Sequence, residues 1–445
     1  MEILNKATRI DLFSLKTPQM RAFHMTWLAF FLCFFGWFGI APLMAIVRED
    51  LMLTKAQVGN TIIASVAITV LVRLLIGPLC DKFGSRLTYT WLLILGSLPV
   101  MGIGLAQSYE SFLLFRLAIG AIGASFVITQ YHTSMMFAPN CVGTANATTA
   151  GWGNLGGGVT QMVMPLIFAA FVMLGVSQFM SWRVAMIIPG VVLLITGIAY
   201  YVFAQDAPEG NYSDLRAQGK IAPRHDKTHG SFLAAAQDYR VWALFAIYAA
   251  CFGIELTLNN IAALYFHDRF HLNVGTAGLI AGLFGLMNIF ARTMGGVFSD
   301  RFAKSNGLKG RVWFLGVVLL LEGIALVIFS RIPTLGVAVI AMMIFSLFVQ
   351  MSEGATYGIV PFINKKAVGP VAGIVGAGGN AGAVAAGFLF RLESLATQDA
   401  LLILGLLVAA TSSLSLLVRF APEVEAEEKA AFAKAVEQRE ALAVI

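Results

Sequence analysis

The sequence is poor in charge, because only 12% of its 445 residues are Asp, Glu, Lys or Arg. That is about half the charged fraction of an ordinary soluble domain. Hydrophobic residues make up 58% of the chain. A chain this apolar has too few polar side chains to cover its own surface in water, which excludes a soluble enzyme. The same composition excludes a disordered chain, and the scarcity of heptads excludes a coiled coil.

Cysteine is also scarce, and the motifs of catalysis are missing. The four cysteines lie far apart and form no C-x-x-C pair, so neither a zinc site nor a disulfide framework is expected. The sequence contains no nucleotide-binding loop, no G-x-S-x-G and no H-E-x-x-H. We therefore expect no enzyme, no metal, no cofactor and no ATP-driven pump.

What the chain has instead is a series of long apolar windows. A helix needs about 20 apolar residues to cross a bilayer core. Leu117–Trp182 runs for 66 residues without a charged side chain, enough for two spans with a turn near Pro139 and Asn140. Twelve transmembrane helices are predicted in all. The other ten windows are Ala22–Val47, Ala56–Cys80, Leu87–Tyr109, Val184–Gln205, and residues 241–266, 270–299, 312–330, 332–364, 367–390 and 400–418.

The basic residues predict the orientation of these spans. Cytosolic loops of membrane proteins carry an excess of Lys and Arg. With both termini in the cytosol, only six basic residues face outward and three lie within spans, out of 30. The net charge of +6 therefore reflects the basic residues of the cytosolic loops, which set the orientation of the helices in the membrane. It does not indicate a nucleic-acid partner, and none is expected. The outward six are Arg48, Lys55, Arg183, Arg269, Arg331 and Arg391, and the three within spans are Arg73, Arg116 and Arg292.

The longest polar interruption, Asp206–Tyr239, divides the chain into two sets of six helices. The expected organisation is a cytosolic N-terminus, two six-helix bundles joined by a cytosolic loop, and a cytosolic tail. The tail after Pro422 is rich in Ala, Glu and Lys and predicts a short solvated helix. The loop and tail are too small for a signalling domain, which argues against a membrane sensor. The predicted boundaries are residues 1–21, 22–205, 206–239, 240–419 and 420–445.

The two halves repeat each other. Residues 73–83 and 292–302 both read R-x3-G-x3-D-[KR]-F, in the second and eighth spans. Gly153–Gly156 and Gly379–Gly382 both read G-N-x-G, in the fifth and eleventh. Each pair is six spans apart, so the repeat unit is six helices. Parallel six-helix repeats with a site between the halves are typical of secondary transporters.

These motifs resemble a known family. Gly77–Arg86 (G-x3-D-[KR]-x-G-x-R) is similar to the loop 2–3 motif of the major facilitator superfamily, and Arg116-x3-Gly120-x2-Gly123 is similar to its proton-transporter motif. The segments Ala150–Gly158 and Gly376–Gly382 resemble the paired nitrate signatures of the nitrate/nitrite porter family. Residues 21–24 (Arg-Ala-Phe-His) and 41–43 (Ala-Pro-Leu) also resemble its high-affinity nitrate transporters, and the similarity covers roughly residues 20–420. It implies an all-α major facilitator fold and secondary transport of nitrate or nitrite in an inner or plasma membrane.

Arg73 and Arg292 are the strongest candidates for an anion site. Each lies eight residues before a predicted cytosolic aspartate, Asp81 or Asp300, which is about 12 Å along a helix. A guanidinium at that depth is costly, and a single one could extend its side chain to the interface. Two at equivalent repeat positions favour a shared central cavity, where the guanidinium fork suits a planar oxyanion. Structural ion pairing is the alternative.

The resemblance adds further substrate contacts. It implies that the signature residues Asn154 and Asn380 contact the anion, and the aromatic residues Phe126 and Tyr131 are candidates to enclose it. The glycines of both signatures also predict close helix packing, which does not exclude a role at the site. These signature glycines are Gly151, Gly153, Gly156, Gly157, Gly376, Gly379 and Gly382.

Proton coupling has its own candidates. Glu255 is predicted near mid-depth, where a carboxyl group is by default functional; a structural partner for a buried Arg is the alternative. Glu322 and Glu353 are the other intramembrane glutamates. Arg116 is assigned equally to a proton-linked role and to ordering helix contacts. The loop motifs predict gating residues at the cytosolic ends of the second and eighth spans: Asp81, Arg86, Asp300 and Arg301.

The coupling mechanism follows from the membrane potential. An anion that enters against an inside-negative potential costs about 2.3 kcal/mol per 100 mV. Import together with more than one proton overcomes this cost, and exchange for outgoing nitrite cancels it. Glu255 and the Arg116 motif favour proton symport, so protons join the anion and the lipid bilayer as expected partners. Carriage of another small anion, such as formate, oxalate or phosphate, is a further alternative.

Overall fold

The computed structural model describes residues 5–138, 141–219, 228–364, 368–426 and 430, and this part of the chain is helical nearly throughout. Eleven helical segments of these described residues are long and apolar enough to cross a membrane. One of them, Val274–Arg331, has 58 residues, or about 87 Å of helix, nearly three times the thickness of a bilayer core. It bends at Gly307 and so supplies two crossings, which accommodates the twelve predicted spans. The turn predicted near Pro139 and Asn140, and most of the tail, lie outside the described residues.

The helices form two compact units. Unit 1 comprises Met1–His225, Thr257–Ile289 and Gly387–Leu395, and unit 2 comprises Asp226–Leu256, Phe290–Ala386 and Ala396–Ile445. Two long helices, α12 and α17, contribute residues to both units. The boundaries of the two predicted six-helix bundles remain a prediction based on the repeat.

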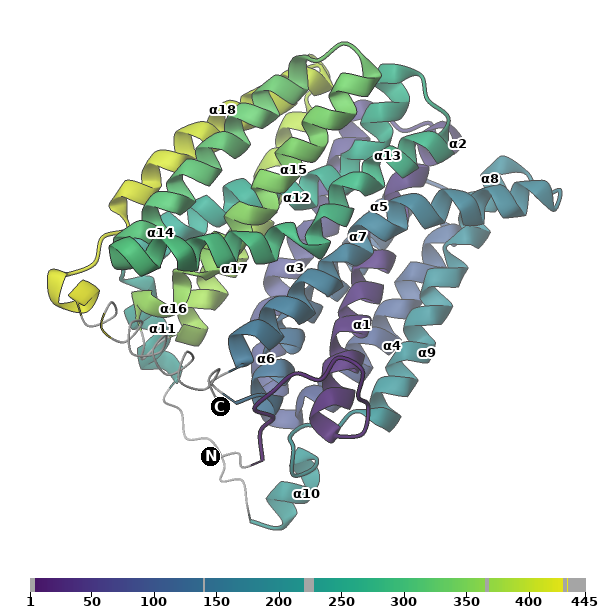
Figure 1. Ribbon diagram of the computed structural model, residues 1–445. Helices are drawn as coiled ribbons and strands as arrows, with labels where there is room; N and C mark the ends of the chain where they lie inside the picture. The colour runs from purple at the N-terminus through teal and green to yellow at the C-terminus, as the bar shows by residue number, and fades with distance from the viewer. Residues whose placement is uncertain (1–4, 139–140, 220–227, 365–367, 427–429, 431–445) are drawn as a thin grey trace. The chain divides into compact units, whose positions relative to one another are not determined.

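Most of unit 1 comes from the first half of the chain. Its helix α1 packs against α7 and against α9, and α4 also packs against α9 (Figure 1). Its elements are α1 (Pro18–Phe38), η1 (Ala41–Leu43), α2 (Met44–Asp50), α3 (Lys55–Phe83), α4 (Ser85–Gly102), η2 (Ile103–Leu105), α5 (Tyr109–Ile119), η3 (Gly120–Ala124), α6 (Ser125–Met136), α7 (Val142–Met173), α8 (Gln178–Ala185), α9 (Ile187–Phe203), α10 (Tyr212–Ala217), α13 (Val274–Leu286) and η4 (Met287–Ile289).

Unit 2 is organised around the bent helix α14, which packs along α15 and α18 (Figure 1). At the bend, Gly307 has φ 60°, a backbone conformation that glycine adopts without strain. The elements of unit 2, with the two shared helices, are α11 (Thr228–Ala236), α12 (Tyr239–Phe270), α14 (Ala291–Arg331), α15 (Leu335–Tyr357), α16 (Val360–Ile363), α17 (Val368–Arg391), α18 (Thr397–Thr411) and η5 (Ser412–Leu417).

Sequence signals explain several helix ends and breaks. Thr54 and Gln57 form a capping box at the start of α3, which satisfies two backbone donors that the first helical turn leaves open. The fourth span changes from α-helix to 3₁₀-helix at η3. There a Cβ on Gly120 would collide with the Ser65 carbonyl, and a Cβ on Gly123 would collide with the Trp37 ring. The glycines of the Arg116 motif therefore permit close helix contacts.

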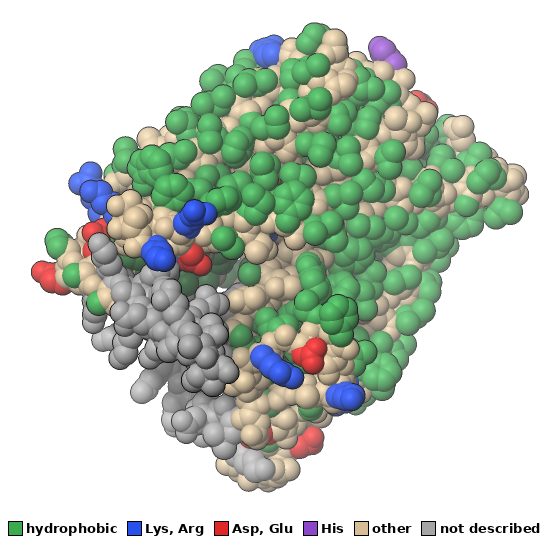
Figure 2. Space-filling model, in the orientation of Figure 1, with side chains coloured by type: hydrophobic (Ala, Val, Ile, Leu, Met, Phe, Trp, Pro, Cys, Tyr) green, Lys and Arg blue, Asp and Glu red, His purple; other side chains and the backbone are tan. Residues whose placement is uncertain are grey.

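Apolar side chains are spread over much of the upper and right-hand part of the face drawn in Figure 2. Across the described residues many large apolar side chains are exposed, and examples are Leu74, Trp91, Ile195, Trp313 and Ile340. Exposed apolar side chains in this number are suited to lipid, because a soluble protein rarely exposes extended apolar patches.

Candidate anion site and proton cluster

In unit 2, Arg292 forms an ion pair with a buried carboxylate. Its Nη1 lies 2.6 Å from Oε2 of Glu353 on α15, and its Nη2 donates a hydrogen bond to the Tyr248 hydroxyl on α12 at 3.0 Å. The side chain of Glu353 is 0% exposed, and that of Arg292 is 10% exposed. Three helices therefore converge on this guanidinium.

Two more buried carboxyl groups act on the same pair. The carboxyl groups of Glu255 and Glu322 both act electrostatically on Glu353. Both residues are fully buried. Unit 2 thus brings the predicted anion-site arginine together with all three intramembrane glutamates found in the sequence.

Two tyrosines complete this cluster and were not predicted. Tyr248 lies beside Arg292, and its ring centroid is 5.1 Å from that of Tyr357. One signal was present in the sequence, because Tyr248 precedes Glu255 by seven residues. Two helical turns place both on one face of the helix.

In unit 1, Arg73 has different surroundings. It lies on α3, is partly buried, and its Nη2 donates to the Gly123 carbonyl at 3.3 Å. Its guanidinium carbon lies 5.5 Å from the ring centroid of Phe126, a distance at which cations and aromatic faces attract. The structure therefore brings together two of the predicted substrate contacts in this unit.

The amide groups of the two signature asparagines are buried. Asn154 is 1% exposed and Asn380 is 0% exposed. Among the described residues, neither amide nitrogen nor amide oxygen of either side chain has a hydrogen-bond partner. A buried amide left in this state costs about 1–3 kcal/mol, so these groups are suited to a polar ligand.

The signature glycines allow helices to touch backbone to backbone. A Cβ on Gly156 would collide with the Phe31 carbonyl in unit 1, and one on Gly382 would collide with the Ala249 carbonyl in unit 2. A Cβ on Gly153 or Gly379 would collide with a phenylalanine ring. Three signature glycines have more room: the built Cβ lies 3.4 Å from the nearest atom at Gly151, 3.2 Å at Gly157 and 3.0 Å at Gly376.

Arg116 connects three helices of unit 1. It is 1% exposed; its Nη1 donates to the Trp37 carbonyl at 3.2 Å and its Nη2 to Oδ1 of Asn260 at 2.7 Å. These bonds tie α5 to α1 and to the second half of α12. The contacts support the helix-ordering role, and a proton-linked role remains a prediction.

The predicted gating residues make different contacts in the two units. In unit 1, Asp81 accepts a hydrogen bond from the Tyr131 hydroxyl at 3.0 Å, and Tyr131 also bonds Tyr212. In unit 2, Asp300 pairs with Arg311 at 2.6 Å across the bend of α14, while Arg301 is exposed. These two hydrogen bonds place the Tyr131 hydroxyl with Asp81 and Tyr212.

Asp206 is a buried carboxyl group that sequence reasoning missed. It is 2% exposed and accepts hydrogen bonds from the backbone N–H groups of Arg86 at 2.7 Å and Tyr212 at 2.9 Å. Burial raises the pKa of Asp206, and these two donors oppose that rise. Burial also raises the pKa of Tyr212 to about 12. Gly84, with φ 86°, approaches the carboxylate so closely that a Cβ would overlap it.

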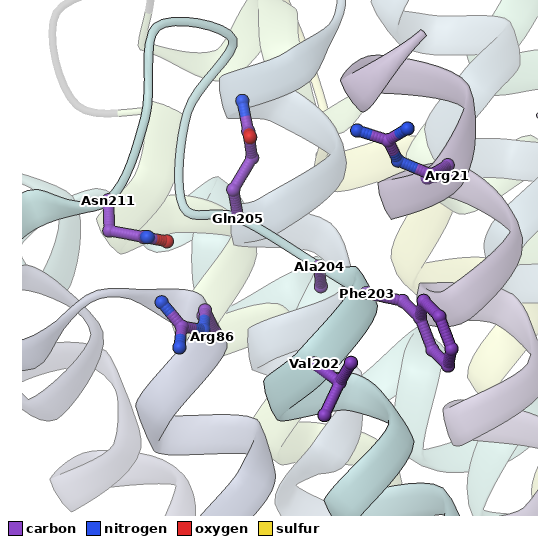
Figure 3. Close-up of a pocket in the computed structure, with 7 residues that line it drawn as sticks. All are labelled: Arg21, Arg86, Val202, Phe203, Ala204, Gln205 and Asn211. Atoms are coloured by element: carbon purple, nitrogen blue, oxygen red, sulfur yellow. The ribbon is translucent and has the colours of Figure 1, made fainter. Parts of the chain in front are cut away.

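A hollow of about 360 Å³ is lined by Arg86, whose backbone N–H bonds Asp206, and by Gln205, the residue before Asp206 (Figure 3). It contains the predicted gating residue Arg86, but its lining includes none of the predicted substrate contacts. It therefore belongs to the surroundings of the loop motif. The hollow is lined by Arg21, Arg86, Val202, Phe203, Ala204, Gln205 and Asn211.

Among the described residues, no three His, Cys, Asp or Glu side chains gather to hold a metal ion.

Eleven long apolar helices, a motif with an intramembrane arginine that recurs six spans later, and helix crossings packed through glycine define a polytopic transporter fold among the described residues. Solved structures agree: a bacterial homologue of the human lysosomal transporter Spinster, inward-facing and occupied, matches with a TM-score of 0.69. The match covers 90% of this chain and 98% of that one at 16% identity, so it concerns the fold alone. The family model "Major Facilitator Superfamily" matches residues 26–387.

Relatives identify the branch of this superfamily. High affinity nitrate transporter 2.5 of Arabidopsis thaliana is 42% identical over 396 residues, covering 89% of this chain and 78% of the relative. The nitrate/nitrite transporter NrtP of Picosynechococcus sp. is 31% identical, covering 82% and 84%. The chain belongs to the nitrate/nitrite porter family of the Major Facilitator Superfamily, as its motifs predicted. It is a multi-pass integral membrane protein.

Proposed function

We propose that this protein carries nitrate, and also nitrite, across the membrane by alternating access. One observation carries the proposal: an arginine recurs at the same position of each repeat, Arg73 and Arg292, deep within an apolar helix. Intramembrane charges are expensive and mark substrate pathways. The similarity to proteins named as nitrate transporters supports nitrate as the anion.

The neighbouring groups suit a planar oxyanion. A guanidinium offers parallel N–H donors to two oxygens at once. Each amide of Asn154 and Asn380 offers two more donors, and these amides are buried without partners among the described residues. Phe126 beside Arg73 supplies an aromatic face. We propose that all of these side chains contact the substrate during the cycle.

Proton symport is the proposed coupling mode. Glu255 is fully buried and interacts with Glu353, so it is the leading candidate to bind a transported proton. Arg116 is kept as a secondary candidate, although its contacts favour helix ordering. Asp81 and Arg86 in one half, and Asp300 and Arg301 in the other, are the proposed gating residues.

Uptake by purified protein in liposomes tests the proposal. Vesicles contain plain buffer or nitrite, nitrate is added outside, and uptake is followed with and without an inward proton gradient. Symport predicts uptake into empty vesicles that rises with the gradient. Empty liposomes and vesicles with Arg73→Ala protein are the controls, and both are expected to show no uptake above leak.

The alternatives give different results in the same assay. Nitrate uptake only into nitrite-loaded vesicles, independent of pH, would establish exchange and assign Glu255 to structure. Strong competition by formate, oxalate or phosphate would establish another anion as the substrate. Absence of nitrate flux in every condition would refute the proposed function.

A further inference from the structure

The partner of Arg292 resembles the proposed substrate. A carboxylate, like nitrate, presents two oxygens in one plane to a guanidinium fork. Glu353 presents such an oxygen 2.6 Å from Nη1 of Arg292, inside a region where the glutamate side chain is fully buried. The position that an incoming oxyanion would take on Arg292 is therefore already taken by an anion of the protein itself.

Helix packing keeps Glu353 in this position. A Cβ on Gly354, next to Glu353, would collide with the backbone carbonyl of Arg292. A Cβ on Gly295, three residues after Arg292, would collide with the backbone carbonyl of Met351. These two glycine contacts bring α14 and α15 together beside the ion pair. The backbones of the two helices are already in contact there, so helix packing fixes the positions from which Arg292 and Glu353 reach each other. Releasing Arg292 then requires a change in the Glu353 side chain or in its charge.

The charges around Glu353 require bound protons. The carboxyl groups of Glu353 and Glu255 both act on the Arg292 guanidinium. If both were ionised, one negative charge would be left uncompensated in a medium where burying it costs several kcal/mol. The titratable and charged groups around Glu353 are Tyr248, Cys251 and Glu255 on α12, Arg292 and Glu322 on α14, and Tyr357 on α15.

We propose that Glu353 competes with the substrate for Arg292 and that protonation of Glu353 releases the guanidinium to bind the anion. The inference rests on the proposed function, because nitrate is taken as the anion. A proton from the aqueous phase converts the Glu353 carboxylate to a neutral carboxylic acid, and nitrate replaces it as the partner of Arg292. The local charge is the same before and after. Entry of the anion therefore does not add net charge to a buried site, and one proton accompanies each nitrate at this step.

Nitrate binding to the purified full-length protein, measured by calorimetry across pH, tests the competition. For the wild type, the Kd for nitrate rises about tenfold per pH unit once Glu353 is ionised, and titrations in two buffers of different ionisation enthalpy show uptake of up to one proton per nitrate. Glu353→Gln removes the competing charge. Its Kd is expected to be independent of pH, at least tenfold lower than that of the wild type at the alkaline end, and its binding to take up no proton.

A matched control separates this effect from the loss of any buried carboxyl group. Glu322→Gln makes the same chemical change at another fully buried position in unit 2, where neither oxygen of Glu322 has a hydrogen-bond partner among the described residues. This variant should retain the pH dependence and the proton uptake.

The possible failures are distinguishable. Wild-type protein that binds nitrate with no pH dependence and no proton uptake overturns the competition and leaves the proposed function intact. So does a Glu353→Gln variant that keeps the wild-type profile. Wild-type protein that binds no nitrate at any pH refutes the proposed function itself. The proton count on the wild type needs no variant, so the inference can be tested even if Glu353→Gln does not fold.

Discussion

Arg73 and Arg292 occupy equivalent positions of the repeat but have different neighbours. Arg73 is partly buried, with contacts to the Gly123 carbonyl and to the face of Phe126. Arg292 is buried, with contacts to the Glu353 carboxylate and the Tyr248 hydroxyl. The repeat has thus kept the cation in both halves, and in the second half a fully buried carboxylate pairs with it. We infer that both arginines serve the anion, whereas the second also carries the response to protons.

The largest expected effect is the loss of uptake when either arginine is removed. Arg73→Ala and Arg292→Ala should each abolish nitrate uptake in liposomes, because each removes a charge and a fork of donors. Arg73→Lys and Arg292→Lys keep the charge but lose the fork, so a small residual rate is expected. Uptake at the wild-type rate in Arg292→Ala vesicles would show that the anion site lies elsewhere.

The second prediction distinguishes the two arginines by stability. Arg292→Ala leaves the buried Glu353 without its cation, and breaking a buried pair in this way costs about 3–5 kcal/mol. Arg73→Ala removes the hydrogen bond to the Gly123 carbonyl and the contact with the Phe126 ring, and each of these contributes about 1 kcal/mol. Thermal unfolding of the purified proteins should show a much larger loss for Arg292→Ala.

A double variant supplies the control for this comparison. Glu353→Gln combined with Arg292→Ala removes the unpaired charge and should recover most of the lost stability. Equal destabilisation by the two single alanine variants would mean that the ion pair contributes no more than the contacts of Arg73.

The third prediction concerns the glycines that both halves share. Gly156→Ala and Gly382→Ala each place a methyl group against a backbone carbonyl, which cannot swing away as a side chain can. Each should lower the free energy of unfolding by about 1–3 kcal/mol. Gly77→Ala and Gly296→Ala are matched controls at repeat-equivalent positions, because a built Cβ there has no atom within 4 Å. Destabilisation of the controls by the same amount would exclude close packing as the cause.

The smallest expected effect is at Phe126. Phe126→Leu removes the aromatic face beside Arg73 but keeps an apolar side chain, a change of about 0.5–1 kcal/mol. The KM for nitrate uptake should rise about two- to fivefold. Phe388→Leu is the control, because Phe388 is 50% exposed among the apolar side chains of α17. An unchanged KM for Phe126→Leu would remove this ring from the substrate site.

The fold could be predicted almost entirely from the sequence. The apolar windows lie on the helices, and the repeat predicted the fold class. The eighth and ninth spans were predicted as separate windows, whereas the structure joins them in one bent helix, α14. Length and hydropathy specify where a helix crosses a membrane, but not whether the turn between two crossings remains helical.

The candidate site could be predicted only in part. Arg73, Arg292 and Glu255 are conspicuous because charge is rare in apolar helices. Tyr248 and Asp206 are not, because a tyrosine is common in such helices and an aspartate is common in a polar loop. Their importance comes from contacts with residues far away in sequence, Arg292 and Arg86. The pairing of Arg292 with Glu353 likewise depends on the crossing of α14 and α15, which no local pattern reports.

The bend of α14 has a mechanical consequence. At Gly307 the chain turns within a helix, the ion pair of Asp300 and Arg311 spans the turn, and the rings of Phe302 and Phe314 stack with centroids 5.3 Å apart. A flexible loop would let the two arms rotate independently. Here the ion pair and the ring stack hold the angle at the bend. A rotation of the segment of α14 that carries Arg292 should therefore also rotate the segment that carries Glu322, so that both move as one rigid body.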